Sequence, residues 1–197
     1  MVEREVNHNM AIPRLETERL ILRPFDPADA KEVQRLAGDR AIADTTLNIP
    51  HPYVDGEAEK WISTHRPKFE AGEFATFALV LRDSGMLIGA MSLHFSQRFD
   101  RAELGYWIGR PYWNEGYCTE AGQAVLRYGF TEWKLNRIHA NYLRRNAASG
   151  RVMQKLGMSR EGVLRQHVKK WGKYEDIVVC AILREDWQKK TGSPAAR

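Results

Sequence analysis

The chain has 197 residues, enough for one domain with a sizeable core, and its 43% hydrophobic and 28% charged residues are typical of a folded protein. No apolar run approaches the roughly 20 residues of a membrane span, and the polar first ten residues do not resemble a secretory signal, so we expect a cytoplasmic protein without membrane contact. The 30 basic and 25 acidic residues are interspersed, and the net charge of +5 favours mild attraction of an anionic ligand over nucleic-acid binding.

The predicted elements alternate between strand and helix within one domain of residues 11–190, with residues 1–10 and 191–197 as flexible ends. Asp26 and Asp55 are good N-caps for the first two helices, and Pro67 should end or kink the second. In chain order we expect strand 20–25, helices 27–37 and 56–67, strands 77–81, 86–95 and 101–109, helix 119–135, strand 137–143, helix 146–156, and strands 163–170 and 174–183. This order predicts an α/β domain of the α+β type, with a mixed, mostly antiparallel sheet flanked by helices.

Cysteine and histidine spacing argues against a metal site. The two cysteines, Cys118 and Cys180, form no Cys-x-x-Cys pair, and the six histidines are scattered singly. His94 and His139 fall in predicted strands, where isolated histidines are more often structural than catalytic. We therefore expect no metal.

The segment between the strand that ends near Gly109 and the helix that begins near Thr119 is suited to binding an anion. A loop that leads into a helix presents free backbone N–H groups and the positive end of the helix dipole, and Gly116 permits close backbone approach. No phosphate-binding lysine motif follows, so this is not a P-loop. An ordinary strand-to-helix turn would have the same features.

This segment also resembles the cofactor loop of the GNAT superfamily of N-acetyltransferases, written Gln/Arg-x-x-Gly-x-Gly/Ala. Residues 113–118 occupy it, with Trp113 in place of Gln or Arg and Cys118 in place of Gly or Ala. Further segments are similar to the RimJ/RimL-type branch, which acetylates protein N-terminal amines. They are residues 15–24, 102–108, 117–121, 146–149, 155–158 and 174–183.

The resemblance implies a GNAT fold that binds acetyl-CoA between two splayed strands, the one ending near Trp107 and Ile108 and the one at 137–143. The diphosphate would rest on the backbone of residues 114–119, and Asn146 and Ser149 would contact the pantetheine. The implied cofactor-binding residues are Trp107, Ile108, Asn114, Glu115, Gly116, Tyr117, Cys118, Thr119, Asn146 and Ser149. Acceptor recognition would fall to residues 40–72 and the closing hairpin.

Two residues are candidates for catalysis. Strand alternation places Glu103 with Gly105 and Trp107 on one face, where its carboxylate can accept a proton from an ammonium acceptor; alternatively, it pairs with Arg101. Ser149 is the candidate that protonates or stabilises the leaving thiolate, because Met153 occupies the position where many relatives carry a tyrosine.

Other side chains near these positions have less specific interpretations. A thiolate at Cys118 would be activated beside a helix start, but the resemblance implies direct transfer without an acyl-enzyme. Asn146 is also simply a good N-cap. The aromatic residues Trp61, Tyr106, Trp107, Tyr112 and Trp113 are expected mostly in the core, with some lining the acceptor pocket.

Three functions remain open from the sequence. The first is acetylation of a protein N-terminal α-amine, such as that of a ribosomal protein, as the branch resemblance implies. The second is acetylation of a small amine such as a polyamine, an amino acid or an aminoglycoside. The third is a non-catalytic acetyl-CoA sensor or a basic nucleic-acid-binding module. Relatives of this type often form homodimers, so a dimer is also an expectation.

Overall fold

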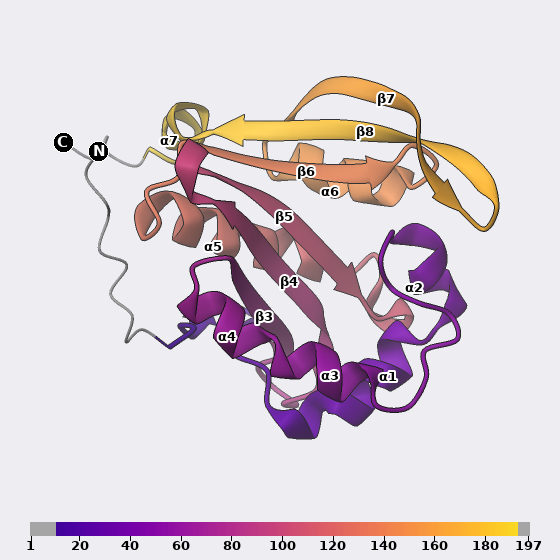
Figure 1. Cartoon of the computed structure of the whole chain (residues 1–197). Helices are drawn as coiled ribbons and strands as arrows, with labels where there is room; N and C mark the ends of the chain where they lie inside the picture. Colours follow the sequence, from indigo (N-terminus) through magenta and orange to yellow (C-terminus); the bar gives the residue numbers. More distant parts are fainter. Residues whose placement is uncertain (1–10, 193–197) are drawn as a thin grey trace.

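The computed structural model describes residues 11–192 and contains one eight-stranded sheet in the order β1-β2-β3-β4-β5-β6-β8-β7 (Figure 1). The strands are β1 (Leu15–Glu16), β2 (Leu20–Arg23), β3 (Phe74–Leu81), β4 (Leu87–Ser96), β5 (Arg101–Ile108), β6 (Arg137–Leu143), β7 (Ser159–Lys170) and β8 (Lys173–Leu183). Within the described range, β5 and β6 form the one parallel pair and every other pair is antiparallel. The predicted fold class is confirmed.

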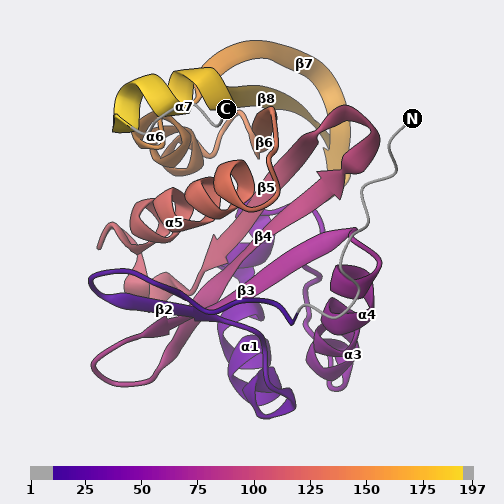
Figure 2. The same ribbon diagram turned by 90° about the vertical axis from the view of Figure 1, so that its left-hand side faces the viewer.

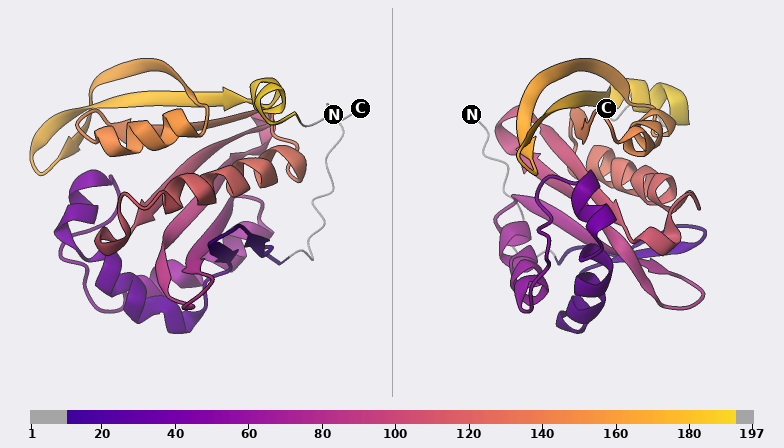
Figure 3. Two further views of the ribbon diagram at one scale, coloured as in Figure 1. Left: turned by 180° about the vertical axis from the view of Figure 1, so that it is seen from behind. Right: turned by 90° about the vertical axis from the view of Figure 1, so that its right-hand side faces the viewer.

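Helices cover both faces of this sheet. They are α1 (Ala30–Ala37), α2 (Arg40–Thr45), α3 (Glu57–Ser63), α4 (His65–Glu70), α5 (Tyr117–Thr131), α6 (Ala147–Lys155) and α7 (Arg184–Thr191). Figures 2 and 3 show α5, α6 and α7 on one face, and α1, α3 and α4 on the other. No helix in the described part of the chain is long and apolar enough to cross a membrane.

Strand alternation in β5 divides its side chains between two hydrophobic cores. Leu104 and Ile108 join the larger core on the α5 side, and Trp107 joins the smaller core beneath α1 and α3. The faces predicted for this strand are therefore correct. Glu103 lies on the α1 and α3 side, whereas Tyr106 packs against the α5-side core.

The sheet opens between β5 and β6. The two strands pair only over Arg101↔Arg137, Ala102↔Ile138 and Glu103↔His139, after which they diverge (Figure 1). The facing backbone edges of residues 104–108 and 140–143 therefore lie outside the β5–β6 ladder. β6 continues to pair with β8 along its whole length, so the splay is confined to one side of β6.

Several predicted boundaries are wrong, each for a local reason. Gly56, in a left-handed conformation with φ of 86°, caps α3, while Asp55 instead accepts a hydrogen bond from Gln34 Nε2 at 2.7 Å. The expected helix breaks at Thr64, because Pro67 has no N–H to bond to the residue four positions earlier. The long helix ends at Thr131 rather than 135, since Lys134 adopts a φ of 52°.

Other elements are longer than predicted or were not predicted. β3 begins at Phe74, β7 begins at Ser159 and α5 begins at Tyr117, and the sequence did not indicate β1, α2 or α7. Thr191, assigned to the C-terminal tail, is the last residue of α7. Residues 1–10 and 193–197, predicted to be flexible, lie outside the described residues.

Candidate active site

A cavity of about 490 Å³ occupies the space between the diverging strands. Its walls come from β4, β5, β6, the starts of α5 and α6, and the segment that follows α2. The predicted site residues that line it are Glu103, Trp107, Ile108, Asn114, Gly116, Tyr117, Cys118, Thr119, Asn146 and Ser149. Of the predicted acceptor segment, Ile42, residues 45–49 and Trp61 contribute to the wall.

The start of α5 presents free backbone donors to this cavity. Gly116 is the N-cap with φ of 82°, and Asn114 before it has φ of 67°. Among the described residues, no side chain forms a capping hydrogen bond at Gly116. The backbone N–H groups of Thr119 and Glu120 bond to Gly116 O, so those of Tyr117 and Cys118 precede the helical ladder and can bind an anion.

Trp113 closes the loop onto the end of β5. Its indole Nε1 donates a hydrogen bond to the backbone oxygen of Ile108 at 2.7 Å. The side chain is 38% exposed and also lines the cavity. A tryptophan at this position therefore fixes the path of the loop relative to the strand edge.

Glu103 lies on the α1 and α3 face, where its neighbours across the sheet are His94 on β4 and His139 on β6. Asn141 Nδ2 donates to Glu103 Oε1 at 3.0 Å, and His139 Nε2 lies 3.9 Å from Glu103 Oε2. Burial lowers the pKa of both histidines, so their imidazoles are neutral near pH 7. The expected alternative partner of Glu103, Arg101, contacts the ring of Phe99 instead.

On the opposite face, two hydroxyl groups form a pair. Tyr106 Oη lies 2.7 Å from Ser149 Oγ, and it also donates to the backbone oxygen of Ser149 at 3.2 Å. Burial raises the pKa of Tyr106, so the phenol keeps its proton. This contact joins β5 to the first turn of α6 and places two proton-bearing oxygens beside the cavity.

Asn146 holds the start of α6 in place. Its side-chain oxygen accepts a hydrogen bond from Ser149 N at 3.2 Å, which confirms the predicted N-cap, and its Nδ2 donates to Thr45 O at the end of α2. Asn146 therefore links the segment after α2 to the helix that carries Ser149. Met153 is buried and packs in the core.

Comparison with known proteins decides the family. A model described as "Acetyltransferase (GNAT) domain" matches residues 19–159, which is more than half of the chain. The chain belongs to the GNAT acetyltransferase family. This GNAT enzyme is 33% identical over 172 residues to an uncharacterized N-acetyltransferase, YnaD, of Bacillus subtilis (strain 168), covering 87% of this chain and 97% of that one.

Two further comparisons concern the predicted branch and the fold. The GNAT enzyme is 29% identical over 188 residues to the [ribosomal protein uS5]-alanine N-acetyltransferase of Escherichia coli (strain K12), covering 91% of this chain and 95% of that one. The structure of RimL, a ribosomal L7/L12 alpha-N-protein acetyltransferase, in complex with coenzyme A superposes with a TM-score of 0.79 over 87% of this chain and 98% of that one. At 16% identity, the RimL likeness shows a shared fold.

The structure separates the predicted site residues of this GNAT enzyme into three groups. Glu103 lies on the α1 and α3 face of the sheet, and Ser149 and Asn146 lie on the α5 face. The loop before α5 lies at the end of β5, between these two groups. Glu115 does not line the cavity; its backbone oxygen accepts a hydrogen bond from Arg19 instead. Cys118 lines the cavity, but burial raises the pKa of its thiol, which is the opposite of what a nucleophile needs.

Sequence reasoning gave no specific role to two side chains at the site. Tyr106 was expected mostly in the core, and Asn141 was not considered. The strand alternation that placed Glu103 also placed Tyr106 on the opposite face, and this was the available signal. The pairing of Tyr106 with Ser149, 43 residues later, depends on how α6 packs and is not encoded in local spacing.

Within the described residues, no cluster of three or more His, Cys, Asp or Glu side chains is placed to hold a metal ion.

Proposed function

We propose that this GNAT enzyme transfers the acetyl group of acetyl-CoA directly to the α-amine of a protein N-terminus. One observation carries the proposal: a single cavity joins the start of α5, the unpaired edges of β5 and β6, and the Glu103 carboxylate. The E. coli relative, whose name specifies a ribosomal-protein alanine, supports an N-terminal α-amine as the acceptor.

The described residues fit acetyl-CoA. The left-handed Gly116 and the free N–H groups of Tyr117 and Cys118 would hold the diphosphate. The edges of β5 and β6 would bond the pantetheine as an added strand does, with Asn146 and Ser149 beside it. When bound, acetyl-CoA supplies a thioester that an uncharged amine can attack.

The acceptor must first lose a proton, because only a neutral amine has a lone pair available for attack. Glu103 is the group that would take this proton, directly or through a water molecule. Asn141 orients its carboxylate, and His139 Nε2 lies 3.9 Å from Oε2, so a water molecule between them would be needed to carry the proton further. An α-amine, with a usual pKa of about 8, needs less help than a lysine, with a usual pKa of about 10.4.

The leaving sulfur gains a negative charge as the C–S bond breaks and the N–C bond forms. The Ser149 hydroxyl would donate a hydrogen bond to that charge, and Tyr106, whose pKa burial raises, would hold that hydroxyl in position; the released thiolate would take its proton from solvent. The amine would thus lose its proton on one face of the sheet, and the charge on the leaving sulfur would be stabilised on the other.

A thiol-release assay with acetyl-CoA tests the proposal against peptides with a free N-terminal alanine or serine, polyamines and aminoglycosides. We expect the highest kcat/KM with the peptides, and mass spectrometry to find the acetyl group on the α-amine. Faster acetylation of a polyamine would show that the acceptor is a small amine rather than a protein N-terminus, while the proposed acetyl transfer from acetyl-CoA would still hold. If calorimetry detected no binding of coenzyme A or acetyl-CoA, the whole proposal would be wrong.

A further inference from the structure

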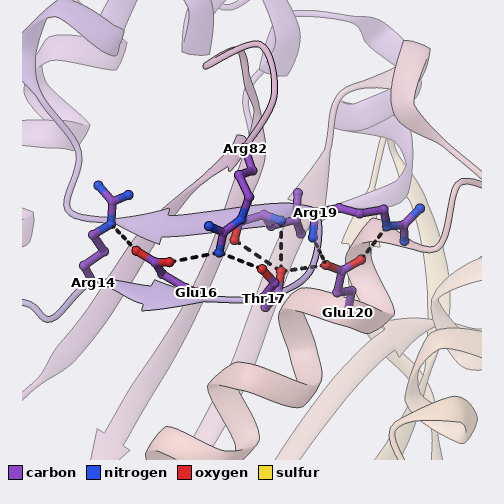
Figure 4. A network of polar contacts seen from close by, with 7 residues as sticks. Arg14, Glu16, Thr17, Arg19, Arg82 and Glu120 are labelled. Carbon is purple, nitrogen blue, oxygen red and sulfur yellow. Dashed lines mark hydrogen bonds and ion pairs between the residues drawn. The ribbon is translucent and has the colours of Figure 1, made fainter.

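The opening motif at residues 15–24 resembles the RimJ/RimL branch but has no part in the chemistry described above. In the structure it forms the β1–β2 turn, and this turn lies against the start of α5 (Figure 4). Arg19, in the turn, contacts residues that follow it by 96 to 101 positions. These long-range contacts place the turn behind the loop proposed to hold the diphosphate.

Arg19 contacts three consecutive parts of that loop. Its Nη1 donates to the backbone oxygen of Glu115 at 3.1 Å, and its guanidinium carbon lies 4.6 Å from the centre of the Tyr117 ring. Its Nη2 lies beside Gly116, 3.5 Å from where a Cβ would stand. One side chain therefore supports the residue before the left-handed glycine, the glycine itself and the residue after it.

Arg19 also neutralises a carboxylate in the first turn of α5. Its Nε donates to Glu120 Oε2 at 2.7 Å, and its backbone N–H donates to Oε1 at 2.8 Å. Thr17 Oγ1 donates to the same Oε1 at 2.6 Å. Burial acts to raise the pKa of Glu120, but these bonds outweigh it and hold the pKa below its usual range.

A charged Glu120 has opposing effects at this position. A carboxylate in the first helical turn stabilises the helix dipole, but it also repels a diphosphate at the same helix end. Arg19 cancels that repulsion because its guanidinium lies directly on the carboxylate. The loop itself contains two residues with positive φ, Asn114 and Gly116, and such a path needs support from its surroundings.

We propose that Arg19 is a positioning residue for the diphosphate of acetyl-CoA, which fixes the Glu115–Tyr117 backbone and screens the charge of Glu120. This inference rests on the proposed function, since it requires that the start of α5 binds the diphosphate. Arg19 itself does not line the cavity and acts through the loop.

The test compares acetyl-CoA with S-acetylpantetheine, which has the same thioester but no diphosphate. We expect Arg19→Gln to raise KM for acetyl-CoA roughly five- to tenfold, the size expected for the net loss of about one ordinary hydrogen bond at a partly exposed site, with kcat within about twofold. KM for S-acetylpantetheine should not change. Glu120→Gln should have a smaller effect, because it removes the repulsive charge together with the ion pair.

Arg82→Gln is the matched control. The side chains of Arg82 and Arg19 are both 44% exposed, and each forms an ion pair with a glutamate of the same network (Figure 4). Arg82 bonds to Glu16 and to the backbone oxygen of Thr17. We expect Arg82→Gln to leave KM unchanged for both donors. If Arg19→Gln does not fold, Arg19→Lys can be used, because it keeps the charge but lacks the planar guanidinium group. This variant should raise KM for acetyl-CoA by a smaller factor and leave KM for S-acetylpantetheine unchanged.

The possible outcomes separate this inference from the proposed function. If an Arg19 variant impairs both donors equally, or lowers only the melting temperature, Arg19 has a purely structural role and the inference is overturned. If the wild-type enzyme does not prefer acetyl-CoA to S-acetylpantetheine, no diphosphate site exists. The proposed cofactor site and the inference about Arg19 would then both be wrong.

Discussion

Replacing Glu103 by glutamine tests the proton transfer most directly. Glutamine has nearly the same shape and keeps an oxygen that can accept the hydrogen bond from Asn141, now 3.0 Å from Glu103 Oε1. The substitution therefore removes the capacity to take a proton while leaving the strand and its packing intact. We expect kcat/KM at pH 7 to fall and the affinity for coenzyme A to stay within about twofold.

The size of the loss follows from the role proposed for the carboxylate. A positioned general base contributes roughly 10²- to 10⁴-fold, and the 44% exposure of this side chain favours the lower end. We therefore expect about a hundredfold loss, or about 3 kcal/mol of transition-state stabilisation. About one-tenth of an α-amine with a pKa of about 8 is neutral at pH 7, so the variant should regain up to about tenfold as the pH rises to 9.

The assay is thiol release across pH 6 to 9.5 with a peptide acceptor, with calorimetry of coenzyme A binding in parallel. Glu161→Gln is the control, because this carboxylate is similarly exposed at 43%, pairs with Arg137 and does not line the cavity. It should leave the pH–rate profile unchanged. A Glu103→Gln enzyme with the wild-type profile would refute the reasoning and remove Glu103 from the mechanism.

Three further predictions concern the pH dependence of stability, the role of Cys118 and the packing of α5 against the sheet. Burial lowers the pKa of His65 to about 4 from a usual 6.5, so between pH 6.5 and pH 4 the unfolded state binds more protons than the folded state. The free energy of unfolding should therefore fall by about 3 kcal/mol as the pH drops from 6.5 to 4. Urea titrations should show that His65→Leu does not lose this stability. Cys118→Ala should keep activity within about twofold, and intact-mass measurements should find no acetylated protein during turnover, because the buried thiol has a raised pKa. Gly129→Ala places a Cβ 2.8 Å from Ile138 Cδ1. The cost of overpacking, about 1–3 kcal/mol, should exceed the gain in helix propensity of about 1 kcal/mol, so the melting temperature should fall. A higher melting temperature would show that the core adapts to the added methyl group.

Periodicity in the sequence predicted most of this fold, and the failures have physical causes. The central strands and α5 carry clear apolar patterns, and their existence and order were correct. α7 was missed because Trp187 is its one buried residue, which leaves no apolar stripe. The first residues of β7 are Ser159, Arg160 and Glu161, which resemble a loop in sequence. Ser159 and Arg160 belong to the strand because they pair with β8, and Glu161 lies at an irregularity in that pairing.

The local parts of the site were predictable, and the long-range parts were not. The glycine before the predicted helix was consistent with an anion site or with an ordinary turn, and Gly116 does adopt a left-handed conformation. Asn146 followed by Ser149 indicates a cap, which the structure confirms. The contact of Tyr106 with Ser149 and that of Arg19 with Glu120 join residues 43 and 101 positions apart, so they depend on tertiary packing.

In the proposed mechanism, the splay between β5 and β6 would let the Glu103 carboxylate and the hydroxyl pair of Tyr106 and Ser149 act on one substrate. Side chains alternate along β5, so Glu103 and Tyr106 project from opposite faces, and in a closed sheet no substrate atom could reach both. Because the ladder stops at Glu103↔His139, a thioester threaded between the strands would meet the amine on one face and release its sulfur on the other. The opening would thus bring groups on opposite faces of the sheet into contact with the same reacting atoms. A disulfide engineered between β5 and β6 beyond Glu103, or a larger side chain that filled the gap between them, should abolish acetyl transfer even though Glu103 and Ser149 are unchanged.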